Sequence, residues 1–178
     1  MRLFVGLSFA HEIRLVLGHL ASGLDSVRWV KSENLHLTLR FIGDVSIGDA
    51  ADLDLMLSAI DSEPFDLQFR GLGYFGKGEK PRSLWVDITP NKNLLRLQEK
   101  VERSVVNAGF SVEGRKFKPH VTLGRFRGRK PRNFDSYLIT NGGFSTAPFT
   151  VSSFVLFESH LGHGGSHYVA LSEYPLDA

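Results

Sequence analysis

The chain has 178 residues, of which 42% are hydrophobic and 22% charged, the balance of a globular protein that can bury a substantial core. It contains no cysteine, which excludes disulfides, a thiol nucleophile and a zinc site built on cysteine. No apolar run reaches the length of a membrane span, so we expect a soluble cytoplasmic protein that does not bind membranes. We also expect one domain over residues 1–178, acting as a monomer.

Hydrophobic periodicity divides the chain into strands and helices. In chain order it predicts a strand at residues 2–9, a helix at 11–20, a strand at 34–41, a helix at 46–60, strands at 65–75 and 83–89, a helix at 91–108, a strand at 119–126, a short helical turn at 135–140, and strands at 149–159 and 167–176. Ser46 and Asn91 are suitable N-caps. Because several strands follow one another directly, antiparallel pairing is favoured and the fold class is α+β.

One motif occurs twice, in ENLHLTLRF and again in FKPHVTLGRF, where His-x-Thr-Leu lies in an apolar run. Residues i and i+2 of a strand point to the same face, so His36 projects with Thr38 and His120 with Thr122. The neighbours that face the opposite way are Leu37, Leu39, Val121 and Leu123. The repeat suggests two pseudo-symmetric lobes, each a mainly antiparallel sheet flanked by helices, with the active site in the central cleft.

The two motifs together indicate acid–base chemistry on a phosphate. Two imidazoles that face each other can act as general base and general acid, because the unperturbed pKa of histidine lies near neutrality. Threonine hydroxyls can donate hydrogen bonds to non-bridging phosphate oxygens, and arginine can add charge and a bidentate fork. One such strand alone would be typical of an ordinary surface strand, whereas the pair predicts phosphodiester cleavage without a metal.

Positive charge gathers around the second motif. Residues 115–132 contain eight basic residues and no acidic residue, although the whole chain has a net charge of only +2. These residues are Arg115, Lys116, Lys118, Arg125, Arg127, Arg129, Lys130 and Arg132. Such a run is often only a solvated loop. Its position around His120 favours an anionic ligand, either a phosphate ester or nucleic acid.

The sequence resembles the two-histidine phosphoesterases, and within them the LigT-like RNA 2′,3′-cyclic phosphodiesterases. Besides the two motifs, the segments that carry the resemblance are MRLFVGLSF, RWVKSENLHLTLRFIGDV, PFDLQFRGLGYF, RSLWVDI and VLFESHLGHGGSHYVALSEYPL, which follow one another in the family's order over nearly the whole chain. The resemblance implies a bilobal fold, no cofactor, and opening of a 2′,3′-cyclic phosphate at an RNA 3′ end, for example of a tRNA fragment, to a 2′-phosphate.

The resemblance also implies roles for individual residues. His36 would be the general acid and His120 the general base, while Thr38, Thr122 and Arg125 would hold the phosphate. Some members of the family also join RNA ends through a 2′-5′ linkage, so ligase activity is a further expectation. Two alternatives stay open: a phosphoesterase acting on a small cyclic nucleotide or a 2′-5′ oligonucleotide, and an RNA-binding module without catalysis.

Two arginines near the motifs pose a question of geometry. Arg125 lies five residues after His120, an odd offset that would aim it away from the histidine on a regular strand. A bulge or strand end at Gly124 would bring it back. Arg40 lies four residues after His36, so on a regular strand it would face the cleft and contact substrate, or form a salt bridge at the rim.

The remaining candidates have a structural interpretation beside the functional one. The segment SHLGHGGSHYV contains His160, His163 and His167, but its glycines indicate a turn between two strands, so we expect no metal site there. Aromatic residues close to the predicted cleft strands could either stack on a base or belong to the core. They are Phe9, Trp29, Phe41, Tyr74, Phe75 and Phe126.

Overall fold

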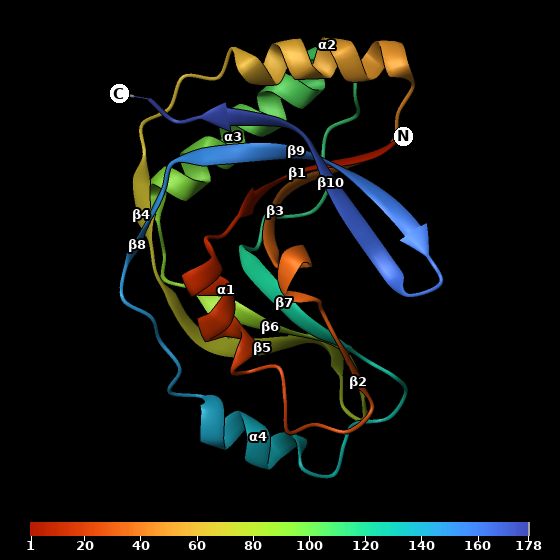
Figure 1. Cartoon of the computed structure of the whole chain (residues 1–178), viewed down its shortest axis with the longest axis vertical. Helices are drawn as coiled ribbons and strands as arrows, with labels where there is room; N and C mark the ends of the chain where they lie inside the picture. Colours follow the sequence, from red (N-terminus) through yellow and green to blue (C-terminus); the bar gives the residue numbers. More distant parts are fainter. Residues whose placement is uncertain (178) are drawn as a thin grey trace.

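A computed structural model describes residues 1–177 as two lobes, at the top and the bottom of the view in Figure 1. The strands are β1 (Arg2–Ser8), β2 (Val27–Trp29), β3 (His36–Asp44), β4 (Phe65–Leu67), β5 (Phe69–Lys77), β6 (Lys80–Ile88), β7 (His120–Phe126), β8 (Phe149–Val151), β9 (Ser153–Gly162) and β10 (Gly165–Pro175). The helices are α1 (His11–Gly18), α2 (Ile47–Ser58), α3 (Lys92–Asn107), α4 (Phe134–Asn141) and the 3-10 turn η1 (Ser32–Asn34). The predicted α+β class is confirmed.

One large antiparallel sheet runs through both lobes. Its strand order is β10-β9-β1-β3-β7-β6-β5, with β2 added to β7, while β4 and β8 form a separate two-stranded sheet. The first lobe holds β10, β9, β1 and β3, and the second holds β7, β6, β5 and β2. A single residue pair, Leu37 with Val121, joins β3 to β7. Because the two motif strands meet only there, the lobes diverge from this point and leave a cleft between them.

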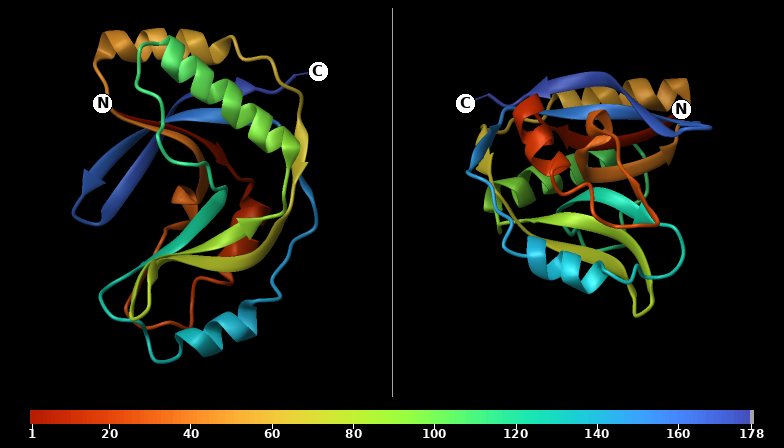
Figure 2. Two further views of the ribbon diagram at one scale, coloured as in Figure 1. Left: turned by 180° about the vertical axis from the view of Figure 1, so that it is seen from behind. Right: turned by 60° about the horizontal axis from the view of Figure 1, so that its bottom comes forward.

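Helices α2, α3 and α4 lie on the outer side of the lobes, whereas α1 lies in the middle of the view in Figure 1. Helices α2 and α3 lie side by side over the first lobe, where α3 packs against β3, and α4 packs against β5 at the far end of the second lobe (Figure 2). Helix α3 therefore follows β6 of the second lobe along the chain but covers the first lobe. No helix within residues 1–177 is both long and apolar enough to span a membrane.

The helix positions follow from local signals in the sequence. The Ser46 hydroxyl accepts a hydrogen bond from the amide of Asp49 at 3.1 Å, and the Asn91 side chain accepts one from the amide of Leu94 at 2.9 Å. Both predicted caps are confirmed, and each supplies a partner to a backbone donor that the helix cannot satisfy. One stripe of α3 is fully buried, and its members are Leu94, Leu97, Val101 and Val105.

Two predicted strands are interrupted, and one strand was missed. The predicted strand at 65–75 breaks at Gln68 into β4 and β5, and that at 149–159 breaks at Ser152 into β8 and β9. At both breaks the chain passes from the small sheet to the large one. Strand β2 is only three residues long and pairs with β7 opposite Gly124. Any side chain at Gly124 would come within 2.6 Å of Val27, so this glycine allows β2 to approach.

Candidate active site

The cleft between the lobes is a cavity of roughly 500 Å³ that both motifs line. His36 and Thr38 reach it from β3, and His120, Thr122 and Arg125 reach it from β7. The alternate residues on the two strands, Leu37, Leu39, Val121 and Leu123, are buried on the opposite face. The predicted division of each motif strand into a cleft face and a core face is therefore confirmed.

Both imidazole rings are held in the same way. Nδ1 of His36 lies 2.7 Å from the carbonyl oxygen of Asn34, and Nδ1 of His120 lies 2.7 Å from the carbonyl oxygen of Lys118. A carbonyl can only accept, so each Nδ1 carries the hydrogen, and Nε2 is the nitrogen left for proton transfer. Nε2 of His36 lies 3.0 Å from the Thr38 hydroxyl, which donates to it when the ring is neutral.

Each histidine also packs against aromatic rings from its own lobe. His36 lies 4.8 Å from Phe4 and 5.1 Å from Tyr168, measured between ring centroids. His120 lies 5.0 Å from Phe75 and 5.7 Å from Trp85. These contacts limit the rotation of the imidazole rings and cover part of their surface. The matched surroundings extend the symmetry of the two motifs beyond the motif residues.

Burial lowers the pKa of both histidines. For His36, loss of hydration is the main cause, opposed by the hydrogen bond to Asn34 and reinforced by the charges of His120 and Arg125. For His120, loss of hydration again dominates, and the nearby charges of Lys118 and Arg125 add to it. An anion placed between the rings would reverse this trend, because negative charge stabilises the imidazolium form.

A bulge turns Arg125 into the cleft. On β7, Gly124 pairs with Leu84 and Thr122 pairs with Trp85, so Leu123 has no partner opposite it. The extra residue shifts the alternation by one, which places the odd-offset Arg125 on the same face as His120. The expectation of an irregularity beside Gly124 is confirmed, and the bulge itself centres on Leu123.

The prediction that Arg40 faces the cleft is wrong, and the cause is a second bulge at the matching place. On β3, Arg40 pairs with Val5 and Thr38 pairs with Gly6, so Leu39 is the unpaired residue. The shift turns Arg40 to the helix-covered face, where it is 8% exposed. The next residue, Phe41, takes the cleft position instead and is 40% exposed.

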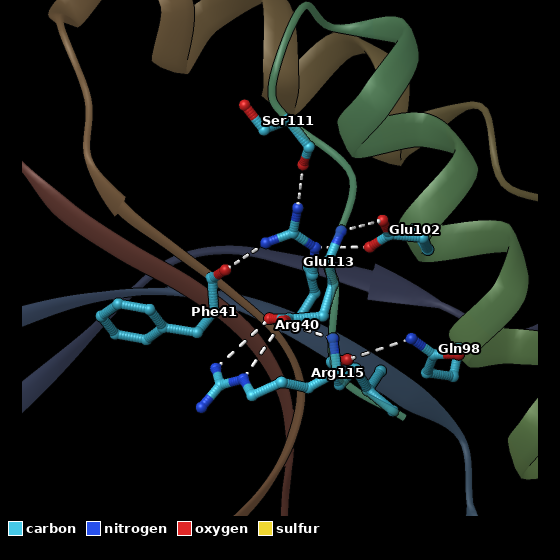
Figure 3. Close-up of polar contacts among 8 residues, drawn as sticks. Arg40, Phe41, Gln98, Glu102, Ser111, Glu113 and Arg115 are labelled. Carbon is cyan, nitrogen blue, oxygen red and sulfur yellow. Dashed lines mark hydrogen bonds and ion pairs between the residues drawn. The ribbon is translucent and has the colours of Figure 1, made fainter. Parts of the chain in front are cut away.

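Arg40 is fully engaged in a structural network at the back of β3 (Figure 3). Its guanidinium forms an ion pair with Glu102 of α3 and donates to the carbonyl oxygens of Phe41 and Ser111. The second carboxylate oxygen of Glu102 accepts the amide of Glu113 at 2.8 Å. Arg40 therefore joins β3 to α3 and to the segment that leads into β7, and it does not line the cleft.

The tip of the β9–β10 hairpin forms one wall of the cleft, which sequence reasoning missed. His163 and Ser166 of this hairpin line the cavity. The buried Asn34 side chain donates to the Ser166 carbonyl at 2.7 Å, which ties the hairpin to the residue that holds His36. Such a contact joins residues 132 apart, and the glycines of the segment indicated only a turn.

The other predicted candidates divide between cleft and core. Phe41 and Trp29 line the cleft, Phe75 packs on His120, and Phe9 is buried in the core. Tyr74 and Phe126 both pack against Phe134. Nε2 of His160 lies 3.2 Å from a carboxylate oxygen of Glu158, and His160 stands opposite His167 in the hairpin. No group of three or more histidine, aspartate or glutamate side chains among residues 1–177 is arranged to hold a metal ion.

Solved structures with this architecture cover essentially the whole chain. The crystal structure of TT0787 of Thermus thermophilus superposes with a TM-score of 0.84 at 26% identity, covering 99% of this chain and 98% of that one. The crystal structure of E. coli LigT complexed with 3′-AMP gives a TM-score of 0.81 at 27% identity, covering 98% and 97%. The fold and the paired motifs therefore define a LigT-like two-histidine phosphoesterase.

Sequence relatives lead to the family. A family model described as the 2′-5′ RNA ligase superfamily matches residues 10–163. An RNA 2′,3′-cyclic phosphodiesterase from Aeropyrum pernix is 37% identical over 169 residues, covering 89% of this chain and 95% of that protein. One of the same name from Thermotoga maritima is 28% identical, covering 97% and 94%. The chain belongs to the 2′-5′ RNA ligase superfamily.

Proposed function

We propose that this protein is an RNA 2′,3′-cyclic phosphodiesterase, an enzyme that opens a terminal cyclic phosphate to a 2′-phosphate without a metal ion. The observation that carries the proposal is the pair of imidazoles in one cleft, each with Nδ1 held by a backbone carbonyl and Nε2 left for proton transfer. The relatives named for this activity support it. Action on tRNA fragments, and action as a monomer in the cytoplasm, stay predictions.

The proposed reaction needs one proton acceptor and one proton donor. Neutral His120 removes a proton from water as the water oxygen bonds to phosphorus. The bond from phosphorus to the 3′-oxygen breaks, and protonated His36 donates its proton to that oxygen. The product carries a 2′-phosphate and a free 3′-hydroxyl. The two histidines have then exchanged protonation states, and solvent restores them.

The cleft also offers ligands for the phosphate. Arg125 carries a fixed positive charge and a planar fork that matches two non-bridging oxygens, and the hydroxyls of Thr38 and Thr122 can donate one hydrogen bond each. Such groups stabilise the charge that builds on the phosphate in the transition state. In the free protein the Thr38 hydroxyl is bonded to His36, so substrate must take over that hydrogen bond.

Joining RNA ends through a 2′-5′ linkage remains a second candidate activity. It is supported by the name of the family model, and it would use the same two imidazoles with their roles exchanged. The cavity of roughly 500 Å³ also accommodates a single nucleotide, so a small cyclic nucleotide or a 2′-5′ oligonucleotide remains an alternative substrate. A module without catalysis is the least favoured, because both histidines and both threonines line one cleft.

The direct test uses an oligonucleotide that ends in a 2′,3′-cyclic phosphate, incubated with the protein in EDTA. We expect chelation to leave the rate nearly unchanged and the product to co-elute with a 2′-phosphate standard. A 3′,5′-cyclic nucleotide should not be hydrolysed, and a 2′-5′ dinucleotide tests the alternative substrate. Loss of activity in EDTA that added zinc or magnesium restores would overturn the two-imidazole mechanism.

The lowered histidine pKa values predict how the rate depends on pH. One histidine must be neutral and the other protonated, so the rate follows a bell centred on the mean of their two pKa values. The profile of kcat/KM reports the free enzyme, where burial lowers both pKa values, so its centre should lie below the ordinary histidine value of about 6.5. The profile of kcat reports the enzyme with substrate bound, in which the phosphate anion raises the pKa values of both histidines.

We therefore expect the kcat profile to be centred at higher pH than the kcat/KM profile. Both are measured on a 2′,3′-cyclic mononucleotide at constant ionic strength. A kcat/KM profile centred above that of kcat would contradict this electrostatic account of the cleft.

A further inference from the structure

The arginines of the basic run continue out of the cleft along a defined part of the fold. Strand β2 pairs with β7 so that Arg28 faces Arg125 and Val27 faces Phe126. The ladder extends one step further, where the amide of Arg127 donates to the carbonyl of Ser26 at 2.7 Å. Residues i and i+2 of an extended strand share a face, so Arg127 lies on the same face as the cleft residue Arg125.

A second hollow begins where this ladder ends. It is lined by Asp25, Ser26, Arg127, Arg129, Lys130, Pro131, Arg132 and Asn133, and its volume is roughly 550 Å³. Arg28 and Arg125 line the first cavity and Arg127 lines the second. Since two residues of strand span about 7 Å, the two hollows are neighbours along the β2–β7 ladder. The loop that forms the second hollow connects β7 to α4 (Figure 1).

Most charges of this surface have no ion-pair partner within residues 1–177. Among the basic residues that line the second hollow, Lys130 forms an ion pair with Asp135 at 2.9 Å. Arg127, Arg129 and Arg132 are exposed and have no carboxylate partner in that part of the chain. Asp25 is the one acidic residue that lines the hollow. Keeping several like charges side by side is unfavourable unless an anion is bound there.

We infer that Arg127, Arg129 and Arg132 form a binding track for the RNA backbone upstream of the reacting end. The inference rests on the proposed function, since the terminal phosphate must lie between His36 and His120. Contacts along the track go to phosphates and carry no base specificity. The track therefore selects a polynucleotide with several phosphates over a cyclic mononucleotide, which reaches only the first cavity.

The test compares two triple variants with the same change in charge. The track variant carries Arg127→Gln, Arg129→Gln and Arg132→Gln. The control carries Lys92→Gln, Arg96→Gln and Arg103→Gln, three exposed cations of α3, which covers the outer side of the first lobe. For each protein, kcat/KM is measured on a 2′,3′-cyclic mononucleotide and on an octanucleotide with the same end. Thermal melting verifies that both variants fold, and single arginine variants replace any triple that does not.

We expect the track variant to lose roughly 10- to 100-fold in kcat/KM on the octanucleotide at low salt and to keep its rate on the mononucleotide. Three lost phosphate contacts to single-stranded RNA should also make binding less sensitive to salt. The slope of log K against log salt concentration should become shallower by about 2. The control should behave like the unaltered protein. Equal losses on both substrates, or a loss on the octanucleotide no larger than that of the control, would overturn the track.

A binding measurement separates this inference from the proposed activity. Fluorescence anisotropy of an octanucleotide that ends in an ordinary 3′-phosphate reports the track without any turnover. If the unaltered protein cleaves no cyclic phosphate but binds this RNA more tightly than the track variant does, the proposed function fails and the track stands. If cleavage is normal and both proteins bind this RNA equally, the track fails alone.

Discussion

Replacing His36 or His120 by alanine is expected to lower kcat by about 10²–10⁴-fold, the usual contribution of a general acid or base. Each imidazole has its Nδ1 held by a backbone carbonyl and offers Nε2 to the cleft for proton transfer. Each single variant should also lose one limb of the bell-shaped pH profile. Steady-state kinetics on a 2′,3′-cyclic mononucleotide measure both effects.

The double variant is expected to be little worse than the less active of the two single variants, because groups that act in one transition state are not additive. His11→Ala is a suitable control, since His11 is an exposed histidine at the start of α1. A His36→Ala protein with near-normal kcat and an unchanged pH profile would refute the two-imidazole mechanism. The repeated motif would then have to serve binding or structure.

The features predicted correctly from the sequence are those that depend on neighbours along the chain. Period-two alternation places Leu37 and Val121 in the core and their neighbouring histidines in the cleft, and the structure follows this for the first four residues of each motif. The caps at Ser46 and Asn91 likewise depend on a backbone amide three residues away. Such signals are local, so one sequence suffices to read them.

The bulges in β3 and β7 break the period-two alternation, so it no longer predicts the orientation of the residues that follow. In both motif strands the third and fourth residues after the histidine are buried side by side, and the fifth is exposed in the cleft. That fifth residue is Phe41 on β3 and Arg125 on β7. An Arg-Phe pair follows both motifs, but the two arginines stand at offsets four and five from their histidines. Gly124 indicated the irregularity on β7, but the matching position on β3 is Arg40, so no residue there indicated a bulge.

Contacts between distant segments were beyond prediction for a different reason. The Phe4 and Tyr168 rings that pack on His36, and the Asn34 side chain that holds the β9–β10 hairpin, depend on which strands become neighbours. The order β10-β9-β1-β3 is set by packing across the whole sheet and leaves no mark at any one residue. Six other aromatic residues were named as candidates without being assigned to the cleft or the core, and Phe4 and Tyr168 were not among them.

Arg40 and Arg125 offer a direct contrast between structure and function. Arg40→Ala leaves the Glu102 carboxylate without its ion-pair partner and two carbonyl oxygens without a donor. Breaking a buried pair in this way costs about 3 kcal/mol, at the lower end of the usual range because Glu102 is 21% exposed to water. For a chain of this size, that loss should lower Tm by about 6–12 °C. At a temperature where the variant is folded, kcat/KM should change little, because Arg40 does not line the cleft.

Arg125→Ala should show the opposite pattern. Its guanidinium is exposed in the cleft and has no carboxylate partner among residues 1–177, so Tm should hardly change. Loss of a charged hydrogen-bond donor to the phosphate should lower kcat/KM by roughly 10- to 100-fold. Thermal melting and kinetics on a cyclic mononucleotide, run on both variants, give four values. A large loss of kcat/KM with an unchanged Tm in Arg40→Ala would contradict this prediction. It would mean that Arg40 acts in the cleft and that the bulge at Leu39 does not turn it away.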